Sequence, residues 1–335
     1  MAKIIILGAG GFGLSIAILC ANAGHDVTVW ARSKEKLGEI RETGELKAKL
    51  PGCKVPETVR LTDDISEVRG KELAVFCVPT SGTREVCEQA ARFIEPQTIA
   101  LNTAKGLENG TLKTIDVVTK ESLPDNPVAI LTGPSHAEEL ARGIPTTVVV
   151  ASYDREISKR VQKMLMTENL RVYSNDDVLG CELGGSLKNI IALAAGVCDG
   201  LGLGDNTKAA LMTRGIREIS ALGKACGADP VTFAGLSGIG DLIVTCCSMH
   251  SRNRRAGILI GKGVTPGEAV RQVGTVEGYG CTRNACELAR RMGVEMPITE
   301  QLYSILFEGK SPKATISALM QRPSKPETEE DFLNR

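Results

Sequence analysis

The stretch Lys3-Ile4-Ile5-Ile6-Leu7-Gly8-Ala9-Gly10-Gly11-Phe12-Gly13 determines the fold class of this chain. An apolar, β-branched run leads directly into G-x-G-x-x-G. The residues that follow, 14–23, have the pattern of a helix, and 25–30 have that of a second strand. Strand, glycine loop, helix and strand in this order are the context in which the glycine pattern predicts a dinucleotide site.

Each glycine of the motif has a physical role in such a site. Gly8 permits the tight turn after the strand, Gly10 lets a pyrophosphate approach the backbone, and Gly13 lets the helix pack closely on the sheet. The free N–H groups and positive dipole end of the helix then face the pyrophosphate. A glycine-rich turn without a ligand is the alternative, and the strand–helix–strand context makes it the weaker one.

The end of the second predicted strand indicates which dinucleotide is held. Sites for NAD usually place an Asp or Glu there, to accept a hydrogen bond from the ribose 2′-hydroxyl. This chain has Trp30-Ala31-Arg32-Ser33, without an acid. A guanidinium matches a 2′-phosphate, so we predict that NADPH is accepted at least as well as NADH. The alternative is that Arg32 is an ordinary surface arginine.

Composition excludes several other classes of protein. The 335 residues suggest two domains, and a formal net charge of zero gives no global attraction for nucleic acid or an anionic membrane. Aromatic residues make up only 3%, which disfavours a base-stacking surface. No uninterrupted apolar run is long enough to span a bilayer. Eleven cysteines without a C-x-x-C motif, and only three histidines, predict reduced thiols in a cytoplasmic protein and no zinc site.

The order of apolar runs predicts an α/β fold followed by an all-α region. Short apolar runs between helical patterns predict an N-terminal Rossmann-type, doubly wound parallel sheet. These predicted strands are Ile4–Leu7, Val27–Trp30, Leu73–Val78, Thr98–Leu101, Val128–Thr132, Thr146–Val150 and Leu170–Tyr173. From Val178 onward the apolar residues recur at helical spacing. We therefore predict a dinucleotide-binding domain over 1–178, an all-α substrate and catalytic domain over 179–322, and a polar tail over 323–335.

Lys188 is the most distinctive titratable residue in the helical half. Its neighbours on the same helix face, at i−4, i−3, i+4 and i+7, are small, namely Gly184, Gly185, Ala192 and Ala195. Such a face leaves room for a ligand to reach the ammonium, and desolvation there would suit it to acid–base chemistry. Close helix packing on a small-residue face, with Lys188 extending outward, is an equally good reading of this segment.

Four other segments carry candidate binding groups. Lys105 follows a predicted strand, and Gly133-Pro134-Ser135 precedes a predicted helix, so Ser135 either binds a ligand or caps that helix. Asp241 follows a glycine-rich segment and would orient Lys188, contact a substrate hydroxyl or cap a helix. The cluster Ser251-Arg252-Asn253-Arg254-Arg255 is the natural clamp for a phosphate in a chain without net charge.

Taken together, these segments resemble the bacterial-type NAD(P)-dependent glycerol-3-phosphate dehydrogenases, from about residue 4 to 308. The motifs that carry the resemblance are the glycine loop, Ala104-Lys105-Gly106-Leu107-Glu108, Gly133-Pro134-Ser135, Leu183-Gly184-Gly185 with Lys188-Asn189, Gly238-Ile239-Gly240-Asp241, the basic cluster, and Val276-Glu277-Gly278-Tyr279. Several motifs in the right order are far more specific than any one of them. The resemblance implies reversible reduction of dihydroxyacetone phosphate to sn-glycerol 3-phosphate, for phospholipid synthesis.

The resemblance also implies roles for individual residues. Lys188 would be the general acid–base, exchanging a proton with the substrate C2 oxygen. The implied substrate contacts are Lys105, Gly133, Ser135, Asn189, Asp241, Arg252 and Asn253, with Ser251 from the same cluster. The implied cofactor contacts, besides Gly8, Gly10 and Gly13, are Gly11, Phe12, Arg32, Lys105, Ala137, Arg252 and Glu277. A homodimer is a further expectation from the resemblance.

Two departures from the family pattern fall near the predicted cofactor. Gly11 stands where a Ser is usual, and Lys49 stands where many members have an aromatic residue. Two rival functions remain open at this point. A ketopantoate- or hydroxyacid-type reductase would bind a carboxylate, which the basic cluster and Lys105 disfavour. A non-enzymatic NADPH sensor would need no acid–base lysine, so Lys188 weighs against it.

Overall fold

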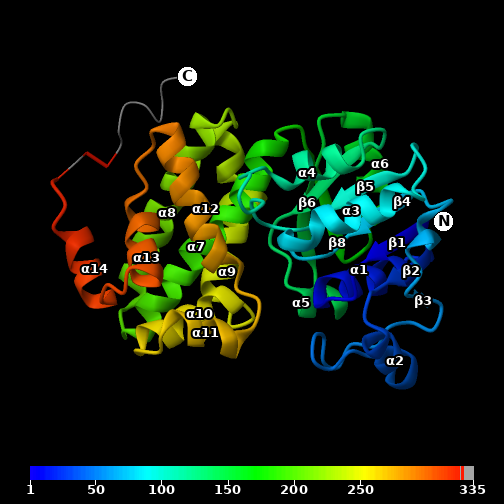
Figure 1. Cartoon of the computed structure of the whole chain (residues 1–335), viewed down its shortest axis with the longest axis horizontal. Coiled ribbons are helices and arrows are strands. Elements are labelled where there is room, and N and C mark those ends of the chain that lie inside the picture. The colour runs from blue at the N-terminus through cyan, green and yellow to red at the C-terminus, as the bar shows by residue number, and fades with distance from the viewer. Residues whose placement is uncertain (325, 328–335) are drawn as a thin grey trace. The chain divides into compact units, whose positions relative to one another are not determined.

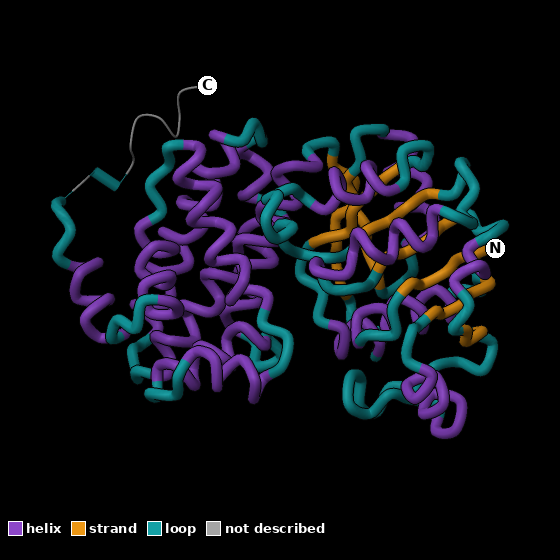
Figure 2. Tube along the Cα trace, viewed as in Figure 1, coloured by secondary structure: helices purple, strands orange, loops and turns teal. Residues whose placement is uncertain are grey.

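The computed structural model describes residues 1–324, 326 and 327, and it divides the chain into two compact units, Met1–Glu182 and Leu183–Arg335. The first unit is a sheet flanked by helices, and the described part of the second unit is helical (Figure 1 and Figure 2). The domain change was predicted at Val178, which is the first residue of helix α7 (Val178–Gly200); the division between the units falls inside that helix. Residues 325 and 328–335 of the predicted tail lie outside the described residues.

One eight-stranded sheet, in the order β3-β2-β1-β4-β5-β6-β7-β8, forms the first unit's centre. Its strands are β1 (Lys3–Leu7), β2 (Asp26–Trp30), β3 (Arg60–Thr62), β4 (Leu73–Phe76), β5 (Ile99–Asn102), β6 (Val128–Thr132), β7 (Thr146–Ala151) and β8 (Leu170–Asn175). All neighbouring pairs are parallel except β6 and β7. The doubly wound α/β fold is therefore confirmed. It differs from the prediction in the reversed direction of β7 and β8, because an apolar run reads the same in either direction.

Strand β3 was not predicted. It is a three-residue strand whose residues Arg60, Leu61 and Thr62 are too few and too polar to give a periodic signal. It nevertheless extends the sheet beyond β2, because Thr28, Val29 and Trp30 pair with it in parallel register. Strand order then reverses between β1 and β4, so the loops after these two strands lie at the switch point where doubly wound sheets bind ligands.

Successive side chains of each strand point to opposite faces of the sheet, so an apolar core lies on each face. In β1, Ile4 and Ile6 point into one apolar core, and Ile5 and Leu7 point into another. The first unit's α-helices are α1 (Gly11–Asn22), α2 (Lys34–Thr43), α3 (Thr83–Ala91), α4 (Ile115–Ser122), α5 (Ala137–Ala141) and α6 (Arg155–Leu165); its short 3₁₀ turns are η1 (Ile65–Val68) and η2 (Thr80–Gly82). Residues of α1, α2 and α6 line the first core, and residues of α3 line the second.

The second unit's described part is built entirely of helices. After α7 these are α8 (Asp205–Ala225), η3 (Pro230–Ala234), η4 (Leu236–Gly240), α9 (Asp241–Cys247), α10 (Arg252–Gly261), α11 (Pro266–Val273), α12 (Glu277–Met292), α13 (Pro297–Phe307) and α14 (Pro312–Met320). Four of them, η3 included, begin with Pro, which suits a first helical position because no N–H is needed there. Helices α9, α10 and α14 were not predicted, because their apolar periodicity is short or interrupted by charges.

Helix α7 is the core of this second unit. Within the described chain it is the one helix long and apolar enough to cross a membrane, but 94% of its most apolar window is buried inside the protein, as in the core helix of a globular fold. Its glycines explain the close packing. A Cβ at Gly196 would lie 2.1 Å from the Arg254 carbonyl oxygen, and one at Gly200 would lie 2.3 Å from that of Ile258. Both glycines let α10 approach the α7 backbone.

Candidate functional site

The glycine loop connects β1 to α1 and leaves an open anion site at the start of α1. Gly8 has φ +128°, and a Cβ there would lie 2.5 Å from the Cys77 carbonyl oxygen, so both the turn and the packing require glycine. A Cβ at Gly13 would lie 2.0 Å from the Gly8 carbonyl oxygen. At Gly10, the N-cap of α1, a Cβ would meet nothing within 4 Å.

These features fit a dinucleotide. The first turn of α1 contains no acidic residue and receives no side-chain cap, so its leading N–H groups remain for an anion. Two buried hydroxyls, Thr80 Oγ1 after β4 and Thr132 Oγ1 at the end of β6, have no hydrogen-bond partner within the described chain. Because β4 and β6 both run parallel to β1, these two hydroxyls lie at the same end of the sheet as the glycine loop. A buried hydroxyl without a protein partner can be satisfied by a bound ligand or by an ordered water.

The two departures from the family pattern touch each other. A Cβ at Gly11 would lie 2.9 Å from the Lys49 carbonyl oxygen, so the segment that carries Lys49 folds over the start of α1. A serine at position 11 would require this segment to move. The same Cβ position lies 3.7 Å from the Ala137 Cβ, which places two predicted cofactor contacts side by side. Phe12, also predicted, packs partly buried against the first core.

Arg32 follows β2, as predicted, but it has a protein partner. Its Nη1 donates hydrogen bonds of 2.9 Å to each carboxylate oxygen of Glu85 on α3. Both side chains are more than half exposed to solvent, so the pair contributes little to folding stability. The guanidinium therefore remains available to an incoming phosphate.

The loops after β5 and β6 bring together three predicted substrate contacts. Lys105 Nζ donates to the Gly133 carbonyl oxygen at 3.1 Å, and Ser135 Oγ donates to the same oxygen at 3.0 Å. Ser135 does not cap α5, because the N-cap residue is His136. The capping alternative is thus excluded for Ser135, and its hydroxyl lies beside Lys105.

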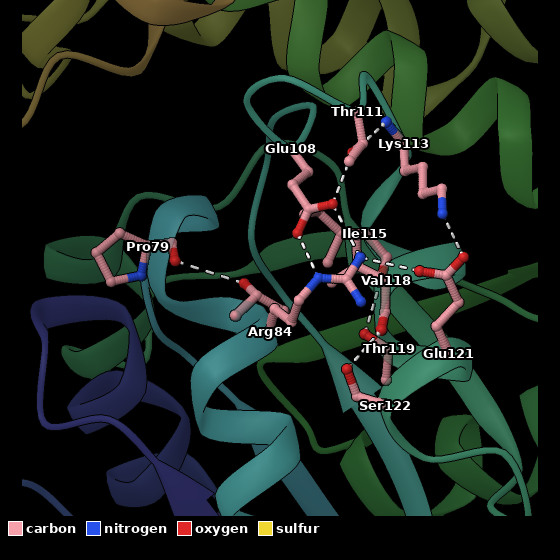
Figure 3. A network of polar contacts seen from close by, with 11 residues as sticks. Pro79, Arg84, Glu108, Thr111, Lys113, Ile115, Val118, Thr119, Glu121 and Ser122 are labelled. Atoms are coloured by element: carbon pink, nitrogen blue, oxygen red, sulfur yellow. Dashed lines mark hydrogen bonds and ion pairs between the residues drawn. The ribbon is translucent and has the colours of Figure 1, made fainter.

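The loop that carries Lys105 is braced by ion pairs that sequence reasoning did not anticipate. Arg84 of α3 lies between two carboxylates, donating to Glu108 at 2.7 and 2.9 Å and to Glu121 at 2.9 Å (Figure 3). The hydrogen bonds from Arg84 lower the pKa of the Glu108 carboxyl from 4.5 to about 2. In the same loop Leu112 has φ +61°, a conformation that a leucine adopts only when its surroundings impose it. The brace therefore holds the loop in a defined shape.

In the second unit, Lys188 is buried and paired. It is 5% exposed, and its Nζ donates to Asp241 Oδ1 at 2.5 Å and to Thr245 Oγ1 at 2.7 Å. Asp241 is 1% exposed and begins α9, directly after the π-helical turn η4. Thr245 Oγ1 in turn donates to the Asp241 carbonyl oxygen at 2.6 Å. Of the three roles open to Asp241 in the sequence, the structure supports orientation of Lys188.

The small-residue face of α7 serves packing as well. A Cβ at Gly184 would lie 2.7 Å from the Ser237 carbonyl oxygen, so this glycine admits the η4 backbone rather than a ligand. The expectation that Gly184 leaves room for a ligand is therefore wrong at this residue. The alternative in which Lys188 extends outward is also wrong, because the side chain is buried.

A second polar network surrounds Asn189. Its Nδ2 donates to Glu277 Oε2 at 3.0 Å, and its Oδ1 accepts from Asn253 Nδ2 at 2.9 Å. Asn253 Oδ1 accepts from the Gly278 backbone N–H at 2.8 Å. Three predicted contacts from α7, α10 and α12 are thus brought together and held in fixed orientations.

The basic cluster divides into occupied and available groups. Ser251 is the N-cap of α10 and accepts from the Arg254 N–H, which gives it a structural role. Arg254 Nε binds Asp199 at 2.7 Å. Arg252 and Arg255 are exposed, and neither has a hydrogen bond or ion pair to any residue that the structure describes. Arg252 therefore keeps a free guanidinium beside the buried Asn253.

Sequence reasoning missed Thr245, Glu85 and Arg84. Thr245 lies one helical turn after Asp241, a spacing that would have identified it once Asp241 was placed on a helix. No sequence signal connects Glu85 to Arg32 or Arg84 to Glu108, because both pairs join segments that only the folded sheet brings together.

These features define the class of protein. A glycine loop at the switch point of a doubly wound sheet, and a buried lysine–carboxylate pair in a unit whose described part is helical, are the components of a nicotinamide-dependent dehydrogenase.

Comparisons with known proteins identify the family. The models described as NAD-dependent glycerol-3-phosphate dehydrogenase N-terminus and C-terminus match residues 3–158 and 177–317. The chain is 50% identical over 331 residues to a glycerol-3-phosphate dehydrogenase (NAD(P)+) of Desulfitobacterium hafniense, covering 98% of this chain and 94% of that protein. It is 52% identical over 329 residues to the enzyme of the same name from Moorella thermoacetica, covering 98% of each.

A solved structure agrees with these matches. The glycerol-3-phosphate dehydrogenase of Coxiella burnetii superposes with a TM-score of 0.92 at 36% identity, over 96% of this chain and 99% of that one. The chain belongs to the NAD-dependent glycerol-3-phosphate dehydrogenase family.

Proposed function

We propose that this protein reduces dihydroxyacetone phosphate reversibly to sn-glycerol 3-phosphate with NADPH or NADH, supplying glycerophospholipid synthesis in the cytoplasm. Family membership supports the reaction. The observation that carries the mechanism is the buried contact of Lys188 Nζ with Asp241 and Thr245.

The residues of the glycine loop, with Arg32, would hold the dinucleotide. When bound, a reduced nicotinamide supplies a hydride to the ketone carbon. Negative charge then develops on the substrate C2 oxygen, and an ammonium in a water-poor site stabilises that charge strongly. Lys188 donates its proton to this oxygen. Asp241 and Thr245 fix the position of the ammonium throughout, so that no reorganisation is needed during the reaction.

The remaining predicted contacts would hold the substrate. Arg252, exposed and without a partner in the described chain, offers its guanidinium to the phosphate. Asn189 and Asn253 present amide groups whose orientation their mutual hydrogen bond fixes. In the first unit, Lys105 is a cationic group beside the Ser135 hydroxyl. Cationic side chains suit a phosphate better than a carboxylate, because a phosphate monoester carries nearly two negative charges.

The deciding experiment measures NADPH oxidation in the presence of dihydroxyacetone phosphate. We expect turnover by the wild type and a loss of about 10²–10⁴-fold in kcat for Lys188→Ala. Lys313→Ala on exposed α14 is the control and should retain full activity. A wild type without turnover would refute the substrate, and a Lys188→Ala variant with near wild-type kcat would refute the mechanism.

A homodimer is a further expectation from family resemblance alone. Light scattering in solution would then report twice the chain mass of 35.6 kDa. A monomeric mass would refute the dimer and leave the proposed reaction intact.

A further inference from the structure

In the folded protein a carboxylate lies beside the end of strand β2, although the sequence has no acidic residue at that position. In NAD sites the acid that binds the ribose 2′-hydroxyl comes from the end of the second strand, and here that place is taken by Arg32. The fold brings Glu85 to the same place from α3, within 2.9 Å of the Arg32 guanidinium. Gln89, one turn further along α3, donates to Glu85 Oε1 at 3.2 Å and holds the carboxylate there.

We propose that Glu85 and Arg32 together set the choice between NADH and NADPH. Glu85 accepts the hydrogen bond of the ribose 2′-hydroxyl of NADH, in place of the missing strand-end acid. Arg32 donates to the 2′-phosphate of NADPH. This assignment rests on the proposed function, and specifically on the nicotinamide dinucleotide site at the glycine loop.

The geometry leaves both groups able to act. Arg32 uses only Nη1 toward Glu85; its Nη2 and Nε have no partner in the part of the chain that the structure describes. Those two nitrogens remain as a fork for phosphate oxygens. Glu85 retains lone pairs for a hydroxyl, because an ionised carboxylate accepts about four hydrogen bonds.

Charge gives the pair its selectivity. A phosphate monoester carries nearly two negative charges at neutral pH, so Glu85 repels the 2′-phosphate while Arg32 attracts it. NADH lacks that phosphate and meets only the favourable hydrogen bond to Glu85. The two residues therefore act in opposite senses, and the wild type accepts both cofactors.

The pair is suited to a clean test because it is exposed. The side chains are 56% and 54% exposed, so removing either charge leaves the fold intact. Glu88 lies on the same helix, is also exposed, and makes no hydrogen bond or ion pair with Arg32, so Glu88→Gln removes the same charge from the same helix as a matched control.

The experiment measures the dissociation constants of NADH and NADPH, without substrate, for the wild type, Glu85→Gln, Arg32→Gln and Glu88→Gln. We expect Glu85→Gln to weaken NADH about tenfold and to strengthen NADPH about threefold. Arg32→Gln should weaken NADPH at least about tenfold and change NADH about twofold or less. Glu88→Gln should leave the ratio of the two constants unchanged.

Two results would overturn the assignment: a Glu85→Gln ratio within about twofold of the wild type, or a Glu88→Gln shift as large as that of Glu85→Gln. A wild type that binds neither cofactor would refute the proposed function and the selector with it. A wild type that binds both cofactors and is insensitive to Glu85→Gln would refute the selector alone.

Discussion

Breaking the pair between Lys188 and Asp241 should destabilise the second unit more than almost any other single polar substitution. At an Nζ–Oδ1 separation of 2.5 Å and an effective dielectric constant of about 20, the Coulomb attraction is about 7 kcal/mol. Most of this offsets the cost of burying both charges, because neither residue is more than 5% exposed. Asp241→Asn removes the attraction and leaves the ammonium buried.

We therefore expect Asp241→Asn to lower the free energy of unfolding by about 3–5 kcal/mol. Lys188→Met should cost a similar amount, because it leaves the Asp241 carboxylate buried alone. The double variant removes both charges, so it should be more stable than the sum of the two single losses predicts, by about 2 kcal/mol or more. All three variants should lose about 10²-fold or more in kcat while keeping their affinity for the dinucleotide.

The assay is urea unfolding followed by two probes. Far-ultraviolet circular dichroism reports the helices, which dominate the second unit, whereas the fluorescence of Trp30, the chain's single tryptophan, reports the first unit. With a slope of about 2–3 kcal/mol per molar urea, the helical transition of Asp241→Asn should move by about 1–2 M. The Trp30 transition should move less. Strictly additive losses in the double variant would show that the two charges are not paired and would refute the reasoning.

Three further outcomes follow from the same structure. Burial raises the pKa of the Glu218 carboxyl from 4.5 to about 7, so the protonated carboxyl stabilises the fold below pH 4.5 and this stability is lost as the pH rises to 7. Glu218→Gln should therefore reduce the loss of unfolding free energy between pH 4 and pH 8 by about 3 kcal/mol, measured by urea unfolding. A loss equal to that of the wild type would contradict this. Gly10→Ala should keep the thermal midpoint of unfolding but bind NADPH about tenfold more weakly or worse, because its Cβ meets no protein atom. Gly13→Ala should lose both stability and binding, because its Cβ would lie 2.0 Å from a carbonyl oxygen. Equal thermal midpoints for the two variants would show that the structure absorbs this clash. Glu108→Gln, which removes the ion pair with Arg84, should lower kcat/KM for dihydroxyacetone phosphate about tenfold in the wild type but only about twofold in a Lys105→Met background. Equal losses in both backgrounds would show that this ion pair does not act through Lys105.

Local pattern predicted most of the fold. Every predicted strand lies within one or two residues of an observed one, because strands buried on both faces of a parallel sheet are continuous apolar runs in the sequence. Strand direction is a different property. The reversal of β7 against β6 leaves no trace in composition, since an apolar run pairs equally well either way. Short β3 and the charged start of α10 lacked the length or periodicity that such a prediction needs.

The sequence predicted the candidate binding residues of the motifs, but it did not predict the residues that form hydrogen bonds and ion pairs with them. Lys188 stood out because an ammonium inside an apolar helix is unusual, whereas the spatial neighbours of that ammonium are more than fifty residues away in the chain. The structure also assigned Ser251 and Gly184 to capping and packing, roles that only their surroundings define.

The sequence alone determined the class of ligand, because the requirements of a pyrophosphate for a turn, a bare backbone and a helix start fall on consecutive residues of one short segment, 3–13. Only the tertiary structure decided how the charged groups are paired. Glu85 meets Arg32, Glu108 meets Arg84, and Asp241 meets Lys188 across elements that are distant in the chain. Hydrogen bonds and ion pairs depend on separations of about 3 Å, which are set by packing and leave no periodic signature in the chain.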